Sequence, residues 1–224
     1  MVPKGASLVL AAGGSSRRMG NGSKKEFAEL DGEVVLCKTL RPFIATKLFS
    51  TIIIVLPEQH IERAEALVRS AFPAPGSSII CTAGGAVRQE SVFKGLLQLK
   101  AHTGIVLIHD GARPWVTEEV IFRVYRAALQ RGAAVPVIPS VNALKEIDGE
   151  GRIVRSLERS AIVGAQTPQG FDLRSILTAH RKAADDGRVY PDDAEVFSTY
   201  GGDVFTVPGD TRNKKITFMA DLES

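Results

Sequence analysis

The fold is decided by residues 7–20, which read SLVLAAGGSSRRMG. The apolar run from Ser7 to Leu10 predicts a strand, and small residues with two arginines follow it at once. Small residues let a backbone approach a ligand closely, and exposed amides and Arg side chains bind phosphate oxygens. A solvated, flexible Gly/Ser loop would have the same composition. The position directly after a first strand favours phosphate binding.

Short apolar runs and helical patterns alternate along the rest of the chain. Strands are predicted at Thr51–Leu56, Ser78–Thr82, Gly104–His109, Ala133–Ile138 and Val204–Val207, and helices at Glu58–Ala71, Arg88–Leu99, Thr117–Ala128 (with Thr117 as N-cap) and Leu173–Ala184. The strands are continuously apolar, as expected of strands buried on both faces of a sheet. The alternation predicts an α/β fold with a doubly wound, mostly parallel, Rossmann-like sheet.

Residues 143–157 break this pattern. Two polar β-runs, Ala143–Ile147 and Arg152–Leu157, flank Asp148-Gly149-Glu150-Gly151, and Asp-Gly is a common hairpin turn. The pair is too polar to belong to a core, so we expect a projecting β-hairpin arm at about 140–160. We expect the whole chain, residues 1–224, to form a single domain with this arm.

Composition narrows the class of protein. The chain has 224 residues and a net charge of only +3, and it contains no long Lys/Arg run, so we expect no nucleic-acid partner. Cys37 and Cys81 form no CxxC motif, which argues against a zinc site or a disulfide framework. The longest apolar runs are too short to cross a bilayer. A cytoplasmic protein without a membrane partner is expected.

Two further loops carry residues suited to a nucleotide. Gly84-Gly85 follows the third strand and leads through Arg88 and Ser91 into a helix, although a plain turn would look the same. His109-Asp110-Gly111-Ala112-Arg113 ends the fourth strand. Asp110 could bind Mg²⁺ or a ribose hydroxyl, or could simply form an Asx turn. His109 is assigned no role.

The common nucleotide motifs are missing. The sequence has no GxxxxGK[ST] string, and residues 20–25 lack the third glycine of GxGxxG, so ATPase and dehydrogenase interpretations lose support. We expect the three loops to end adjacent strands and to bind a nucleoside triphosphate with Mg²⁺.

Several short motifs, in order along nearly the whole chain, resemble the 2-C-methyl-D-erythritol 4-phosphate cytidylyltransferase family. They are Ala11-Ala12-Gly13, Arg18-Met19, Lys25, Gly84-Gly85, Arg88, Ser91-Val92, Asp110, Ala112-Arg113-Pro114, Glu158-Arg159, Gln166-Thr167-Pro168-Gln169, Asn213, Lys215-Ile216-Thr217 and Asp221-Leu222. The resemblance implies a nucleotidyltransferase that transfers CMP from CTP to 2-C-methyl-D-erythritol 4-phosphate and releases pyrophosphate. It also implies a homodimer in which the arm contributes to the partner's site.

The same resemblance implies roles for individual residues. Catalytic residues would be Arg18, Lys25, Arg159 and Lys215; nucleotide-binding residues would be Ala11, Ala12, Gly13, Gly84, Gly85, Ser91, Asp110 and Gly111; acceptor-binding residues would be Arg113, Arg159, Thr167 and Lys215. Asp110 would lie near an Mg²⁺ ion held mainly by the phosphates of CTP.

The sequence departs from the family pattern near the acceptor. Ala143 and Pro191 stand where the family has threonines, Ala86 stands where an acid is common, and the glycine loop is one residue longer. Ribitol 5-phosphate is therefore the alternative acceptor. A catalytically silent nucleotide-binding protein is the alternative of another class, although the retained cations argue against it.

Overall fold

A computed structural model describes residues 5–13, 24–99 and 104–222. Arg18 and the rest of the glycine loop after Gly13 lie outside these residues. The large sheet contains β1 (Ala6–Ala11), β4 (Phe49–Leu56), β5 (Ser78–Ala83), β6 (Ile105–Asp110), β7 (Ala133–Pro139), β10 (Val163–Ala165), β11 (Gln169–Asp172) and β12 (Phe205–Pro208). The α-helices are α1 (Val35–Ala45), α2 (Ile61–Ala71), α3 (Arg88–Leu97), α4 (Glu118–Arg131), α5 (Leu173–Asp185) and α6 (Asp193–Tyr200).

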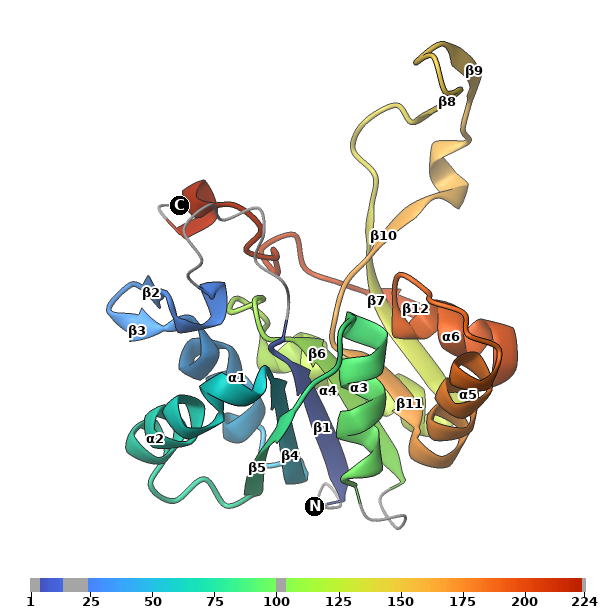
Figure 1. Ribbon diagram of the computed structural model, residues 1–224. Helices are drawn as coiled ribbons and strands as arrows, with labels where there is room; N and C mark the ends of the chain where they lie inside the picture. The colour runs from blue at the N-terminus through green and yellow to red at the C-terminus, as the bar shows by residue number, and fades with distance from the viewer. Residues whose placement is uncertain (1–4, 14–23, 100–103, 223–224) are drawn as a thin grey trace.

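The sheet has the order β10-β7-β11-β6-β1-β4-β5, with β12 beside β7 (Figure 1). The pairs from β6 through β1 and β4 to β5 are parallel, as is β12 with β7. β11 is antiparallel to both β6 and β7, and β10 is antiparallel to β7. The predicted α/β sheet is confirmed, with parallel strands at its centre.

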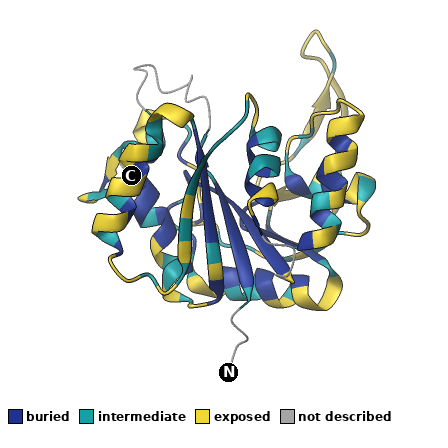
Figure 2. Cartoon of the chain, turned by 60° about the horizontal axis from the view of Figure 1, so that its bottom comes forward, coloured by how far each residue is buried: buried dark blue, intermediate teal, exposed yellow. Residues whose placement is uncertain are grey.

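Alternate residues of the central strands pack into two separate hydrophobic cores, one on each face of the sheet. Leu8 and Leu10 of β1 join a cluster with α1, α2 and α4, whereas Val9 joins a cluster with α3 and α5 on the other face. Since side chains of a strand alternate between faces, this is what a continuously apolar strand requires. Figure 2 shows the result, a dark sheet between helices whose outer faces are exposed.

β5 is an exception to the expected burial. It forms the edge of the sheet, and only one side of it pairs with another strand, β4. None of its residues is fully buried, and Ile80 is 42% exposed. Its apolar sequence predicted a strand correctly but could not distinguish an edge from the centre.

Several elements were not anticipated from the sequence. These are α1, which contains Pro42, the small pair β2 (Glu29–Leu30) and β3 (Glu33–Val34), the strands β10 and β11, and α6. β11 is short and inserts between β6 and β7, which precede it in the chain. Gly170 makes this position possible, because a Cβ there would lie 2.9 Å from Val124 Cγ1 of α4.

The arm is present as expected. β8 (Lys145–Ile147) and β9 (Ile153–Ser156) form an antiparallel hairpin, all of whose strand residues are exposed, and Figure 1 shows it projecting from the body. The turn differs from the expected Asp-Gly type. It spans five residues, and the left-handed position is Gly151, with φ of +82°, while the Asp148 carboxylate accepts from the amides of Glu150 and Arg152.

His109 is buried beneath the carboxyl ends of the strands. Its ring lies 4.8 Å from that of Phe43, and both ring nitrogens have partners, Nε2 the carbonyl of Arg113 and Nδ1 the hydroxyl of Thr167. Because Nε2 donates to a carbonyl, Nδ1 is the acceptor, which fits a neutral imidazole. Burial lowers the pKa of His109 from 6.5 to about 3.

His109 should therefore make the protein sensitive to acid. The unfolded chain binds a proton at this residue below pH 6.5, whereas the folded chain does not until about pH 3, so stability falls as the pH drops between these values. Between pH 7 and pH 5, the free energy of unfolding of the wild type should fall by about 2 kcal/mol more than that of His109→Gln. Urea titrations at both pH values test this. His60→Gln, at a partly exposed histidine, is the control substitution.

Candidate active site

The predicted nucleotide-binding loops meet over the end of β4. The amide of Ala12 donates to the carbonyl of Val55 at 2.7 Å, and that of Gly84 donates to the carbonyl of Leu56 at 2.9 Å. Our expectation that the three loops end adjacent strands was wrong in one respect, because β4 separates β1 from β5. The loops after β1 and β5 are instead joined through the end of β4, whose carbonyls at Val55 and Leu56 accept their hydrogen bonds.

Ser91 fixes the shape of the Gly84-Gly85 loop. Its Oγ accepts from the amide of Gly85 at 3.0 Å and donates to the carbonyl of Val87 at 3.0 Å. A Cβ on Gly13 would lie 3.6 Å from the same oxygen, so the β1 and β5 loops converge on Ser91. The predicted residues Gly13, Gly84, Gly85 and Ser91 are thus brought together.

On the other side of β1, the end of β6 is joined to the same region. The amide of Gly111 donates to the carbonyl of Ala11 at 2.8 Å. A Cβ on Gly111 would lie 2.9 Å from that of Ala12, so glycine permits this close approach. The structure therefore places Ala11, Ala12 and Gly111 beside one another, as the prediction required.

Asp110 is the centre of the charged part of the site. Its Oδ1 lies 2.9 Å from Arg88 Nε, and its Oδ2 lies 2.8 Å from Lys215 Nζ and 3.4 Å from Arg113 Nε. Burial opposes ionisation of this carboxyl, but the charges of Arg88, Lys215 and Arg113 outweigh it and hold the pKa of Asp110 well below its usual range. The carboxylate thus brings together one cation from its own loop and two from other segments, the start of α3 and the C-terminal segment.

Lys25 is tied to this cluster through the C-terminal segment. Lys25 lies in the 3₁₀ helix η2 (Lys25–Phe27), and its Nζ donates to the carbonyl of Ile216 at 3.0 Å. The amide of Ile216 donates to the carbonyl of Ala112 at 2.8 Å. One residue of the C-terminal segment therefore connects Lys25 with the loop after Asp110.

A cavity of about 330 Å³ opens beside this cluster. It is lined by Arg88, Asp110, Arg113, Ala165, Gln166, Thr167, Gln169, Pro191, Asp192, Glu195 and Lys215. The lining contains both cationic and anionic side chains, among them Lys215 and Glu195. Such a lining can bind a ligand that carries both a phosphate and hydroxyl groups.

Thr167 lines the cavity, but its hydroxyl is hydrogen-bonded to residues of β6. It accepts from the amide of Asp110 at 3.1 Å and donates to His109 Nδ1 at 2.9 Å. The side-chain amide of Asn213 also donates to the carbonyl of Thr167 at 2.8 Å. The role of Thr167 in acceptor binding stays a prediction.

Arg159 is not among the residues that line this cavity. It lies in the 3₁₀ helix η4 (Arg159–Ala161), between β9 and β10 on the arm, and is exposed. Within one chain, Arg113 and Lys215 are thus brought together at Asp110, and Arg159 is displayed on the surface.

Two residues of the site were missing from the predicted set. Arg88 binds Asp110, and its Nη1 lies 2.8 Å from Oδ2 of Asp193. Arg88 follows the Gly84-Gly85 motif and was among the residues that resemble the family, but it was assigned no role. Asp193 begins α6 and lies 105 positions from Arg88, so no local pattern connects them.

The described residues do not form a protein-held metal site. No group of three His, Cys, Asp or Glu side chains suited to a metal occurs among them, and both oxygens of Asp110 are engaged by cations. Mg²⁺ prefers oxygen ligands that are free to coordinate it. Direct ligation by Asp110 does not fit this arrangement.

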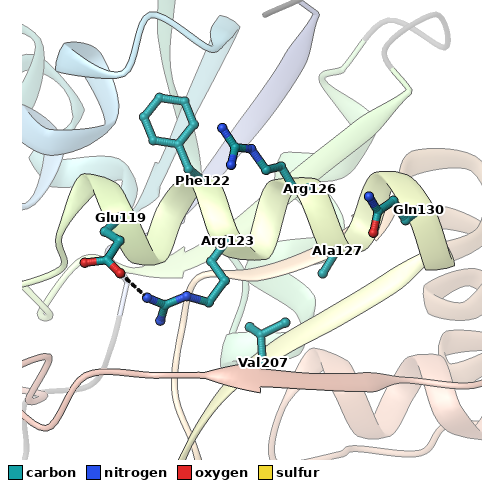
Figure 3. Close-up of a pocket in the computed structure, with 7 residues that line it drawn as sticks. All are labelled: Glu119, Phe122, Arg123, Arg126, Ala127, Gln130 and Val207. Atoms are coloured by element: carbon teal, nitrogen blue, oxygen red, sulfur yellow. Dashed lines mark hydrogen bonds and ion pairs between the residues drawn. The ribbon is translucent and has the colours of Figure 1, made fainter.

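A larger cavity, about 560 Å³, lies on α4 against Val207 of β12 and holds none of the predicted residues (Figure 3). Arg123 is paired there with Glu119 and donates to the carbonyl of Pro208, and the Arg126 guanidinium lies 5.9 Å from the ring of Phe122. The charged side chains of this cavity, Glu119, Arg123 and Arg126, therefore already have partners on α4 or at Pro208. The smaller cavity at Asp110 is the candidate site.

The two glycines of the β5 loop should differ in their tolerance of a methyl group. A Cβ on Gly84 would lie 2.8 Å from the buried Ser91 Oγ and 3.3 Å from Val55 Cγ1, whereas the atoms nearest to a Cβ on Gly85 all belong to the side chain of Glu90, which is 44% exposed. Gly84→Ala should lower the free energy of unfolding by about 1–3 kcal/mol. Gly85→Ala should cost less than about 1 kcal/mol, since an exposed side chain can move aside. Equal losses in urea unfolding would contradict this.

Comparison with known proteins agrees with this geometry. The family model for IspD, 2-C-methyl-D-erythritol 4-phosphate cytidylyltransferase, matches residues 6–224. The enzyme of that name from Halalkalibacterium halodurans is 38% identical over 216 residues, 96% of this chain and 93% of the relative. A bifunctional enzyme IspD/IspF from Solidesulfovibrio magneticus is also 38% identical, but this chain spans only 55% of it.

Solved structures give the same result. 4-Diphosphocytidyl-2C-methyl-D-erythritol synthase from Anaerococcus prevotii has a TM-score of 0.84 and 27% identity, covering 98% of this chain and 95% of that one. The cytidylyltransferase from Thermus thermophilus has a TM-score of 0.77 and 32% identity, covering 97% of this chain and 95% of that one. This chain belongs to the 2-C-methyl-D-erythritol 4-phosphate cytidylyltransferase family.

Proposed function

We propose that this chain transfers the cytidylyl group of CTP to 2-C-methyl-D-erythritol 4-phosphate and releases pyrophosphate. The observation that carries the proposal is the cavity at Asp110, where Arg88, Arg113 and Lys215 converge beside the ends of β1, β5 and β6. Membership of the family supplies the identity of the two substrates.

The lining of the cavity suits a polyol phosphate. The guanidinium of Arg113 and the ammonium of Lys215 offer charged donors to a phosphate, and the carboxylates of Asp192 and Glu195 offer acceptors to hydroxyl groups. CTP would lie over the glycines that converge on Ser91, with its phosphates toward Lys25. The two substrates would then meet between Lys25 and Lys215.

The reaction needs no general base from the protein. The acceptor's phosphate is largely dianionic at pH 7, because its second pKa is about 6. One of its oxygens bonds to the α-phosphorus of CTP while the bond to the bridging oxygen breaks, and pyrophosphate leaves with that electron pair. His109, the histidine beside the site, is buried and has both nitrogens engaged.

Charge is the main obstacle, since a dianion approaches a polyanion. Preorganised cations lower this barrier. In our proposal, Arg18 and Lys25 stabilise charge that builds on the α-phosphate, and Lys215 with Arg159 holds the acceptor in line. A divalent cation such as Mg²⁺, carried by the CTP phosphates, would further neutralise the triphosphate.

The arm suggests how Arg159 reaches a site. The hairpin projects from the body and exposes Ile147, Ile153 and Val154, each between 57% and 60%. An isolated hairpin is marginal in water, and a two-fold axis would supply an identical arm to cover these side chains. We propose a homodimer in which Arg159 acts in the site of the partner subunit.

A cytoplasmic location is also proposed. Cys37 and Cys81 are free thiols, as is usual in a reducing compartment. Within the described parts of the chain, no helix combines the length and the apolar character that spanning a membrane requires.

Pyrophosphate release from purified protein with Mg²⁺ tests the activity and its specificity. CTP with 2-C-methyl-D-erythritol 4-phosphate should give the highest kcat/KM, and UTP should be a poor substitute, because the cytosine amino group has no counterpart in uracil. Ribitol 5-phosphate is the control acceptor. A higher kcat/KM with ribitol 5-phosphate would reject the proposed acceptor, and equal turnover with UTP would reject the proposed base selectivity.

Mixing two inactive variants tests the shared site. Lys25→Ala and Arg159→Ala should each be inactive alone, because each loses one cation at the reacting phosphates. If Arg159 acts in trans, a mixed dimer contains one site with both defects and one site with neither. After random subunit exchange, activity should recover to about a quarter of the wild-type value per chain. Failure to recover, with exchange verified by mass spectrometry of tagged subunits, would place Arg159 in its own subunit's site.

A further inference from the structure

A buried chain of polar contacts leads from the cavity into the helices behind it. Arg88 joins Asp110 to Asp193, with Nε 2.9 Å from one carboxylate and Nη1 2.8 Å from the other. Beyond Asp193, its Oδ1 lies 3.2 Å from Nε2 of His180 in α5. His180 is thus connected to the active-site carboxylate through two intervening side chains.

His180 itself cannot contact a substrate in the cavity. Its side chain is fully buried, and it borders a separate cavity of about 200 Å³ between α3 and α5. Its ring stacks on that of Phe93, with centroids 6.0 Å apart and an interplanar angle of 9°. The polar route from His180 to the cavity runs through Asp193.

The contact with Asp193 has a defined direction. A carboxylate only accepts hydrogen bonds, so Nε2 of His180 carries the proton and donates it. Among the described residues, Nδ1 of His180 is buried and has no hydrogen-bond partner. The polar interactions of this imidazole are therefore directed to Asp193 alone.

Asp193 is consequently fixed from two sides. Its Oδ1 accepts from His180, and its Oδ2 accepts from Arg88. Burial opposes the ionisation of Asp193, but Arg88 and His180 together hold the pKa of Asp193 below its usual value. An immobile carboxylate at this position anchors one end of the Arg88 guanidinium, which sits on a long and otherwise flexible side chain.

The Nε atom of the same Arg88 side chain orients Asp110. Because Arg88 Nε binds Oδ1, the other oxygen of Asp110 faces Lys215 and Arg113, at 2.8 and 3.4 Å. If Arg88 lost its anchor, Asp110 could rotate and pair with both oxygens to Arg113 or Lys215. These cations would then be drawn away from the phosphate that they are proposed to hold.

We infer that His180 is a positioning residue for nucleotidyl transfer, acting through Asp193 and Arg88 to set the orientation of Asp110. This inference rests on the proposed function, because the reaction that His180 would affect is the proposed cytidylyl transfer. It predicts that loss of the Nε2 donor costs turnover more than CTP affinity, since His180 and Asp193 take no part in the backbone contacts that shape the Gly84-Gly85 loop around Ser91.

Two variants of His180 separate the hydrogen bond from the packing. His180→Phe keeps an aromatic ring against Phe93 but removes the donor, whereas His180→Gln retains an N–H at similar reach. His180→Phe should lower kcat about tenfold or more with little change in KM for CTP, because small displacements of catalytic groups are costly. His180→Gln should recover most of that loss. Phe93→Leu, which disturbs the other face of the ring, should lower the melting temperature without this loss in kcat.

A double-mutant comparison tests the route. In an Asp193→Asn background, His180→Phe should cause no further fall in kcat, because the pathway is already broken. Multiplicative losses would show that His180 acts by another path and would overturn the inference. Equal kcat losses in His180→Phe and His180→Gln would also overturn it, since packing would then be the cause.

A spectroscopic readout is independent of catalysis. The Arg88 Nε–H resonance, assigned by its disappearance in Arg88→Lys, should shift and exchange faster with water in His180→Phe and stay near its wild-type position in His180→Gln. An unchanged resonance in His180→Phe would overturn the coupling. If the wild type itself gives no pyrophosphate, the proposed function fails, and this resonance still decides whether His180 controls Arg88.

Discussion

The ionised carboxylate of Asp110 is the interaction on which the site depends. Arg88, Arg113 and Lys215 come from three separate segments, and each would be repelled by the others without an anion between them. Taking a carboxylate out of water costs several kcal/mol, which only close and well-oriented cations repay. Since the pKa of Asp110 is held low, the cluster stays ionised in the physiological range.

In the proposed mechanism, the same arrangement prepares the chain for a phosphate substrate. Asp110 pairs with these cations in the absence of substrate, and in the proposed mechanism the cations would then be available to phosphate oxygens. Because little reorganisation is then needed during the reaction, the cations can stabilise charge as it develops. The backbone contacts of Ala11, Ala12 and Gly84 join the ends of β1, β4, β5 and β6, and the cluster at Asp110 lies at the end of β6.

Sequence patterns were informative where the determinants are local. The apolar run of β1, the N-cap Thr117, whose hydroxyl accepts from Val120, and the polar hairpin were all predicted. β11 and the ion pair of Arg88 with Asp193 were not, because both depend on segments that meet only in three dimensions. Lys215 was placed by its resemblance to a family motif, and the structure supplies the physical reason, its contact with Asp110.

The junction at Ile216 has a consequence for how the protein is made. Lys25 contacts a carbonyl that lies 191 positions later in the chain, and the same residue's amide binds the loop after Asp110. Contacts of such long sequence separation form late, because their loops are expensive to close. A nascent chain can assemble β1, β4, β5 and β6 well before residue 216 leaves the ribosome. During that interval Lys25 and Asp110 lack their partners Ile216 and Lys215, so the cluster at Asp110 is completed only when the C-terminal segment has been made.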